Sequence, residues 1–261
     1  MSSSSSSVQV TVEPVDGSGR LARVTIDHVA RLNVLNDTLI SELRTVFTGL
    51  AADRTLRCVV LDGAGDRAFI GGADIHVMAQ LDQETAESFI RSLHDACAAI
   101  RELPIPIIAK IRGYCLGAGL EVAASCDLRV ASRDATFGMP EVRVGIPSVI
   151  EAALLPRLIG TGRAARLLYT GETIQADEAE RWGLIDRVVP RAQLDTATQA
   201  WVTAIVSAGP EAIRLQKGLM RDWEQLPLSD AVECGIRAFS DAYRTDEPQR
   251  FMQRFLDRTR R

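Results

Sequence analysis

Lysine, histidine and long apolar runs are scarce in this 261-residue sequence. Its only lysines are Lys110 and Lys217, so arginine carries nearly all of the positive charge, and the formal net charge is −4. This charge balance gives no reason to expect a nucleic-acid partner. No stretch approaches the roughly 18 apolar residues of a membrane span, and the N-terminal Met-Ser tract lacks the apolar core of a secretory signal. We therefore expect a cytoplasmic protein that binds neither nucleic acid nor membranes.

Several sequence signatures of catalysis are also missing. The five cysteines form no C-x-x-C motif, which indicates reduced core thiols. The three histidines lack the spacing of a metal site, so we expect no metal. The motifs G-x-x-x-x-G-K-[ST] and G-x-S-x-G are absent, which argues against a P-loop and a hydrolase nucleophile elbow. The turn Gly117-Ala118-Gly119 does not match G-x-G-x-x-G, so a Rossmann fold has weak support.

The composition is that of a globular protein, with 46% hydrophobic and 25% charged residues. Apolar runs and period-2 alternation predict strands, and longer periodic stretches predict helices. The expected strands are residues 8–12, 21–26, 58–61, 105–111, 128–132, 136–138 and 186–189, and the expected early helices are one capped near Asn36 and one over residues 81–103. This order suggests repeated ββα turns.

The chain divides into three predicted parts. Residues 1–7 are expected to form a disordered tail, and residues 8–207 an α/β core. Residues 208–261 are expected to form a helical extension, because Pro210, Pro227 and Pro248 punctuate helical patterns there.

The stretch from Gly113 to Pro147 holds the best candidate chemistry. A glycine-rich turn at residues 117–119 opens an apolar helix, and unpaired backbone amides at such a start favour negative charge. Glu121 lies near the first turn of this helix, and Glu141 follows Pro140 at the end of a predicted extended segment. Amide donors and two carboxylates are suited to stabilising an oxyanion while moving protons. The alternative for each glutamate is a solvated surface acid, the commoner role of a single glutamate.

Seven motifs occur in an order that resembles one known family. They are residues 31–36 (RLNVLN), 68–75 (AFIGGADI), 111–121 (IRGYCLGAGLE), 126–127 (CD), 137–141 (FGMPE), 155–164 (LPRLIGTGRA) and 176–189 with its WGLI. Together they resemble the crotonase (enoyl-CoA hydratase/isomerase) superfamily from about residue 8 to residue 258. The resemblance implies an α/β fold, a crotonase-like ββα spiral core with a C-terminal helical extension.

The resemblance also implies an activity, the hydration of 2-enoyl-CoA thioesters by an enoyl-CoA hydratase. By motif position, the backbone amides of Ala73 and Ala118 would hold the thioester oxygen. Glu121 and Glu141 would share one water and add it in syn fashion. One glutamate deprotonates the water that attacks C3, and a glutamate delivers the proton to C2. No separate cofactor is expected, because coenzyme A is part of the substrate.

Coenzyme A would be bound by residues from several motifs. The family resemblance assigns this role to Arg31, Leu32, Gly71, Ala73, Asp74, Ile75, His76 and Arg258. His76 stands where relatives often have lysine, and Arg258 stands where a neighbouring subunit's lysine reaches the phosphates. Family members are usually trimers or dimers of trimers, so the partners implied are an acyl-CoA and further copies of this chain, with residues 208–261 forming the trimerisation region.

The segment after Glu141 departs from the family pattern. It is about one residue shorter than usual and lacks the glycines that usually follow the proline, and it places Ser148, Val149 and Glu151 at the expected acyl pocket. Ser148 could take over the role of a glycine that helps to hold the water, through its N–H or its hydroxyl. A branched, polar or cyclic acyl group would fit this change. The alternatives left open are a Δ3,Δ2-enoyl-CoA isomerase or other enolate-forming crotonase reaction and, ranked lower, a non-catalytic CoA-binding assembly protein.

Overall fold

Ten strands of the computed structural model form two sheets. The model describes residues 6–15 and 19–259, except for the side chains of residues 258 and 259. The larger sheet has the order β1-β2-β3-β5-β7-β10, and the smaller has the order β4-β6-β8-β9. The strands are β1 (Ser7–Pro14), β2 (Arg20–Asp27), β3 (Leu56–Gly63), β4 (Ala68–Ile70), β5 (Ile107–Ile111), β6 (Tyr114–Leu116), β7 (Leu128–Ser132), β8 (Thr136–Gly138), β9 (Thr173–Gln175) and β10 (Arg187–Val189).

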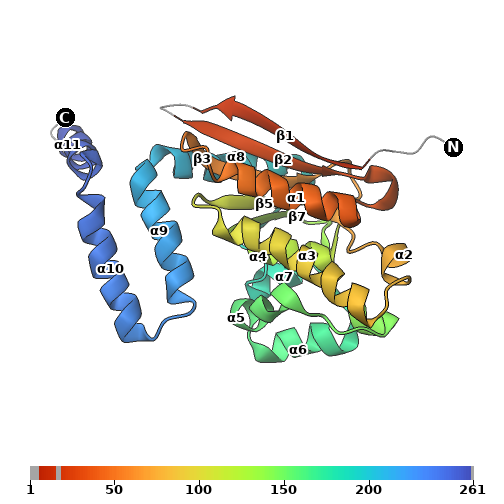
Figure 1. Cartoon of the computed structure of the whole chain (residues 1–261). Coiled ribbons are helices and arrows are strands. Elements are labelled where there is room, and N and C mark those ends of the chain that lie inside the picture. The colour runs from red at the N-terminus through yellow and green to blue at the C-terminus, as the bar shows by residue number, and fades with distance from the viewer. Residues whose placement is uncertain (1–5, 16–18, 260–261) are drawn as a thin grey trace.

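From β3 to β8, consecutive strands alternate between the two sheets. β3, β5 and β7 pair in parallel in the larger sheet, and β4, β6 and β8, which follow them in the chain, pair in parallel in the smaller one. Helices follow β4 and β6 before the chain returns to the larger sheet. This is the ββα spiral predicted from the sequence, and the fold prediction is confirmed (Figure 1).

Helices cover both faces of the larger sheet. α1 packs on α3 at one face, and α8 contacts β3, β5 and β7 at the other. The α-helices are α1 (Asp37–Leu50), α2 (Ile75–Met78), α3 (Gln83–Glu102), α4 (Ala118–Ser125), α5 (Leu155–Ile159), α6 (Thr161–Thr170), α7 (Ala176–Trp182), α8 (Leu194–Ser207), α9 (Pro210–Trp223), α10 (Leu228–Ala242) and α11 (Glu247–Thr259). Four short 3₁₀ helices are η1 (Val29–Arg31), η2 (Glu141–Val144), η3 (Ile150–Leu154) and η4 (Arg191–Gln193).

Local chemistry accounts for several helix starts. The side chain of Asn36 accepts a hydrogen bond from the Leu39 amide and so caps α1, as expected. Asp82 and Thr85 form a reciprocal capping box at the start of α3. Because Asp82 fixes this start, α3 begins two residues later than the apolar periodicity predicted.

Short elements account for most differences from the predicted strands and loops. β4 and β9 were not expected, because β4 lies beside a glycine turn and β9 lies in a mostly helical part of the chain. Glu141 was expected at the end of an extended segment, but it begins the 3₁₀ helix η2. Ser7 is the first residue of β1, whereas residues 1–5 of the expected tail lie outside the described residues.

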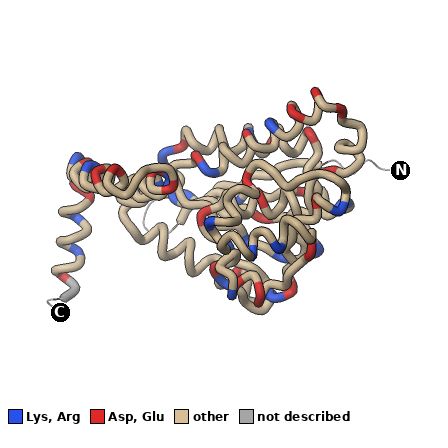
Figure 2. The backbone as a smooth tube through the Cα atoms, turned by 90° about the horizontal axis from the view of Figure 1, so that it is seen from below, with Lys and Arg blue, Asp and Glu red and all other residues tan. Residues whose placement is uncertain are grey.

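The helices α9–α11 lie beside the sheets and extend away from them (Figure 1). Acidic and basic residues are spread along these helices (Figure 2). Lys217 of α9 donates to both oxygens of Asp127, at 2.5 and 2.6 Å, and so ties the extension to the core. α10 leaves large apolar side chains in solvent, with Leu228 82% and Phe239 69% exposed. Within the part of the chain that the structure describes, no helix is long and apolar enough to cross a membrane.

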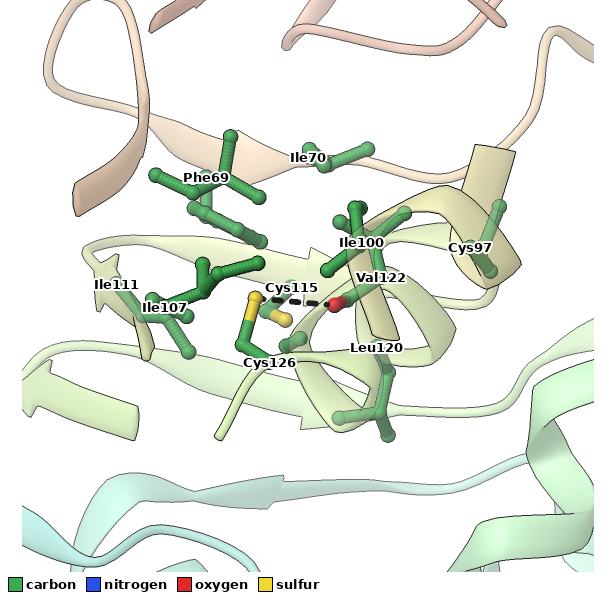
Figure 3. Close-up of a cluster of buried hydrophobic side chains, with 14 of the residues drawn as sticks. Phe69, Ile70, Cys97, Ile100, Ile107, Ile111, Cys115, Leu120, Val122 and Cys126 are labelled. Carbon is green, nitrogen blue, oxygen red and sulfur yellow. Dashed lines mark hydrogen bonds between the residues drawn. The ribbon is translucent and has the colours of Figure 1, made fainter. Parts of the chain in front are cut away.

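The main core surrounds α4, the helix that carries Glu121. Apolar side chains of β4, β5 and α3 pack around it, among them Phe69, Ile70, Ile100 and Ile107 (Figure 3). Every residue of α4 is buried. The thiol of Cys126 donates to the carbonyl of Val122 at 3.4 Å, which satisfies one carbonyl near the end of this helix (Figure 3). Any carboxylate on α4 is therefore largely removed from water.

Candidate active site

Three parallel strands of the smaller sheet end at the same edge. Ile70 of β4 is paired with Cys115 of β6, and Leu116 of β6 is paired with Gly138 of β8. Ala73 comes three residues after Ile70, and Ala118 comes three residues after Cys115. Glu141 likewise comes three residues after Gly138. Since carboxyl ends of parallel strands meet at one edge, this register brings two backbone turns and one glutamate together.

The backbone amides of Ala73 and Ala118 are available for a ligand. Among the described residues, neither amide donates a hydrogen bond to a backbone or side-chain acceptor. Ala118 is the first residue of α4, where the helix dipole adds to the positive potential of the amide. Both residues line one cavity of about 720 Å³. Two unused donors in one cavity are the groups that stabilisation of an oxyanion requires.

Two glycines allow these turns to approach their neighbours. Gly117 has a φ of +51°, and a Cβ at this position would collide with the carboxyl group of Glu141. A Cβ on Gly119 would collide with the carbonyl oxygen of Ile70 in β4. Both positions therefore require glycine, one because of the carboxylate and one because of the strand that leads to Ala73.

Glu121 is a buried acid with one backbone donor. Its side chain lies in the same cavity, the residue is 5% exposed, and its Oε1 accepts a hydrogen bond from the Ala152 amide at 3.1 Å. Burial raises the pKa of Glu121 to about 8. The Ala152 hydrogen bond lowers this pKa, and the charges of Glu141 and Glu151 raise it. Glu121 therefore holds a proton at neutral pH.

Glu141 faces the same cavity from η2 and has a different partner. Its Oε2 accepts a hydrogen bond from the Ser148 hydroxyl at 2.7 Å. The two glutamates thus lie in unlike surroundings, which suits one carboxyl group to give a proton while the other accepts one.

The cavity continues from these polar groups into an apolar pocket. Its apolar wall comes from α3 and from the loop before η3; the residues include Leu81, Ala86, Phe89, Ile90, Leu93, Ile146, Pro147 and Val149. Ser148 and Val149 therefore lie in the cavity where the sequence predicted the acyl pocket. Glu151 does not line it.

A second cavity of about 540 Å³ adjoins the first. The two share Ala73, Met78, Glu141 and Ile146 as wall residues. Most of the predicted CoA-binding residues line this second cavity, namely Arg31, Leu32, Gly71, Ala73, Asp74 and Ile75. His76 lines neither cavity, and the Arg258 side chain lies outside the described residues.

The family follows from comparison with known proteins. The family model described as enoyl-CoA hydratase/isomerase matches residues 16–261. The chain belongs to the enoyl-CoA hydratase/isomerase family. It is 34% identical to a short-chain-enoyl-CoA hydratase of Clostridium acetobutylicum over 241 residues, which is 92% of each chain. It is also 34% identical to a crotonyl-CoA hydratase of Syntrophomonas wolfei subsp. wolfei over 240 residues, again 92% of each chain.

Solved structures agree with this assignment. An enoyl-CoA hydratase from Bacillus anthracis superposes with a TM-score of 0.89 at 30% identity, covering 95% of this chain and 96% of that one. The predicted superfamily and the predicted enzyme class, enoyl-CoA hydratase, are confirmed.

Arg31 and Asp74 form an ion pair in this member of the family. The Arg31 guanidinium donates to both oxygens of Asp74, at 3.0 and 3.3 Å. The same Asp74 carboxylate caps α2 by accepting from the His76 amide at 3.0 Å. The ion pair therefore fixes the turn that follows Ala73.

Sequence reasoning missed several residues around the two cavities. Arg67 and Arg143 line the second cavity, but each stands outside a recognisable pattern. The Ala152 amide that holds Glu121 was missed because a backbone donor leaves no mark in the sequence. His94 was treated as an isolated histidine, yet its Nδ1 lies 2.9 Å from Oε1 of Glu151. The spacing between positions 94 and 151 gives no signal for this pair.

Proposed function

We propose that this family member hydrates 2-enoyl-CoA thioesters to 3-hydroxyacyl-CoA. One observation carries the proposal: two unused backbone amides and two carboxyl groups in unlike surroundings line a single cavity. The names of the two relatives, a short-chain-enoyl-CoA hydratase and a crotonyl-CoA hydratase, point to the same reaction.

In the proposed reaction, the thioester oxygen accepts hydrogen bonds from the amides of Ala73 and Ala118. One glutamate carboxylate takes a proton from water, whose oxygen forms a bond to C3. The C2–C3 π electrons then move to give an enolate, with its charge on the thioester oxygen. The other carboxyl group gives its proton to C2 as the carbonyl re-forms. Donors fixed in advance are suited to this charge, and losing one costs roughly 100-fold or more in rate.

The unlike surroundings of the two glutamates support this scheme. Burial raises the pKa of Glu121 to about 8, so this group carries a proton at pH 7, whereas Glu141 accepts a hydrogen bond from Ser148. Addition of water needs one group that takes a proton and one that gives a proton. Syn addition needs both groups on the same face of the double bond, and both line the same cavity.

The second cavity is the proposed site for coenzyme A. It opens into the acyl cavity at Ala73, so a thioester placed there would have its acyl part in one cavity and its CoA part in the other. Arg31, Arg67 and Arg143 line it, and guanidinium groups recognise phosphates by bidentate hydrogen bonds.

The exposed apolar side chains of α10 and α11 support assembly into a homotrimer or a dimer of trimers. Patches of this kind on soluble proteins usually mark an interface. The residues include Leu228, Val232, Ile236, Phe239, Met252 and Phe255. The oligomeric state and the cytoplasmic location stay predictions.

The decisive experiment assays the purified protein with crotonyl-CoA and longer 2-enoyl-CoAs in ¹⁸O-labelled water. Hydration predicts ¹⁸O at C3 of the product. Glu121→Gln and Glu141→Gln should each lower kcat by at least about 100-fold, because each removes one proton-transfer group. Glu102→Gln serves as the control, since Glu102 is exposed at the end of α3.

Other results would point to the alternatives. A shifted double bond without ¹⁸O would identify an isomerase or another enolate-forming reaction. Binding of CoA in a calorimeter without turnover of any enoyl-CoA would identify a non-catalytic CoA-binding protein.

A further inference from the structure

Glu151 is a buried acid that the proposed mechanism leaves without a role. It lies in η3 and is only 6% exposed. Its Oε1 lies 2.9 Å from Nδ1 of His94, a residue of α3 whose side chain is about half exposed. Its Oε2 is buried and has no hydrogen-bond partner among the described residues. A carboxyl group in such a place needs a reason, because burial of an ionised group is costly.

The turn that contains Glu151 also donates a hydrogen bond to Glu121. Ala152, the next residue, donates its amide hydrogen to Oε1 of Glu121 at 3.1 Å and to the Val149 carbonyl at 2.9 Å. Ile150, the residue before Glu151, has a φ of +38°. A β-branched residue in this region is strained, and such a conformation persists only where its surroundings enforce it.

The contacts of η3 show what holds Ile150 in this strained conformation. η3 packs on α3, α4 and α5. Among the described residues, the only side-chain hydrogen bonds from η3 are the one to His94 on α3 and the one to Glu121 on α4. The His94–Glu151 pair therefore ties η3 to α3, as the contact between the Ala152 amide and Glu121 ties it to α4.

We propose that Glu151, held by His94, is a positioning residue for Glu121, because it fixes the strained turn whose Ala152 amide holds Glu121 and places a negative charge beside it. This inference rests on the proposed function. It extends that function by naming the residues that position one of the two glutamates. Neither Glu151 nor His94 lines the cavity, so neither touches the substrate.

The charges around Glu121 come from a small set of groups. Glu141 in η2 and Glu151 in η3 both raise the pKa of Glu121, after burial as the main cause. Cys97 of α3 is near both Glu121 and Glu151, but burial raises its pKa so far that it stays a neutral thiol. Arg157 of α5 donates to the Glu224 carbonyl instead. Of the two acids that raise the pKa of Glu121, Glu151 is the one that does not line the cavity.

The test is a ¹³C-carboxyl NMR titration that needs no turnover. The Glu121 signal is assigned by its loss in Glu121→Gln, and its midpoint is then measured in the unmodified chain, in Glu151→Gln and in Asp95→Asn. Asp95 neighbours His94 on α3 but pairs with Arg44 at the surface, 3.4 Å away, so it is the matched control. Replacing Glu151 by glutamine should move the midpoint of Glu121 to lower pH, because Glu151 raises the pKa of Glu121. The control should leave it unchanged.

A kinetic test on His94 separates positioning from simple stability. His94→Ala should lower kcat by about tenfold to a hundredfold with little change in KM, because Glu121 loses its fixed place. His94→Gln, whose amide can still donate to Glu151, should restore most of kcat. His94 is half exposed, so both variants should fold.

Each outcome decides a separate point. An unchanged Glu121 midpoint in Glu151→Gln, or unchanged kcat in His94→Ala, would overturn the positioning role. If the chain turned over no enoyl-CoA at all, the proposed function would fail, whereas the NMR shift would still decide whether Glu151 acts on Glu121.

Discussion

Glu121→Gln should make the protein more stable while it removes activity. Folding holds the Glu121 carboxyl group in the apolar surroundings of α4, where its pKa is raised from 4.5 to about 8. The unfolded chain ionises this group above about pH 4.5, whereas the folded chain keeps it protonated up to about pH 8. The native state therefore loses stability, relative to the unfolded state, as pH rises through this window.

The magnitude follows from the size of the pKa change. Each pKa unit corresponds to about 1.36 kcal/mol, so the difference between 4.5 and about 8 amounts to roughly 5 kcal/mol at most. Glutamine is neutral at every pH and keeps an oxygen that can accept from the Ala152 amide. The variant should thus match the unmodified chain near pH 4, exceed it by about 3 kcal/mol at pH 7, and approach the full gain above pH 8.

Urea unfolding followed by circular dichroism at several pH values between 5 and 8.5 measures this difference. Glu102→Gln, which also removes one carboxyl group of this chain but from an exposed position, should show almost no pH-dependent gain. A Glu121→Gln difference that stays constant across this range would refute the reasoning, since it would mean that Glu121 is ionised in the folded protein.

Other predictions concern the walls of the two cavities. Gly117→Ala should lower kcat at least about 100-fold, measured at saturating substrate, because the new methyl group strains a φ of +51° and displaces the Glu141 carboxyl group. Ala86→Phe should fill the apolar pocket and reduce kcat/KM for an eight-carbon enoyl-CoA far more than for crotonyl-CoA; equal losses would mean that the acyl chain lies elsewhere. Arg143→Gln should raise KM several-fold with kcat unchanged if this arginine binds CoA phosphates. The kcat/KM profile should fall above about pH 8, where Glu121 loses its proton.

The long helices and strands and the order of the motifs were predictable from the sequence. Some short strands and the hydrogen-bond partners of the site residues were not. β7 and β8 have the bounds that their apolar runs predicted. β4 and β9 were missed, and each pairs with a strand far away in the chain. Propensity acts within a few residues, whereas these pairings depend on tertiary packing.

In the candidate site, too, the lining residues were predictable from the sequence and their hydrogen-bond partners were not. Motif order placed Ala73, Ala118, Glu121 and Glu141 correctly on the lining of one cavity. It could not show that Ala152 holds Glu121, because any residue type supplies a backbone amide. Nor could it show that Glu151 faces His94 rather than the cavity, because a change of one rotamer or one turn redirects a side chain without changing the sequence pattern.

The candidate site at the edge of the smaller sheet combines two kinds of group, backbone amides and acidic side chains. The donors at positions 73 and 118 belong to the main chain, so most side-chain replacements there would leave them in place as long as β4 and β6 keep their register. The two acids are side chains, and a single replacement removes either one. Under the proposed function, the backbone donors for the thioester stay in place while the reacting side chains change, so new activities are expected from replacements at positions 121, 141 and 148–151.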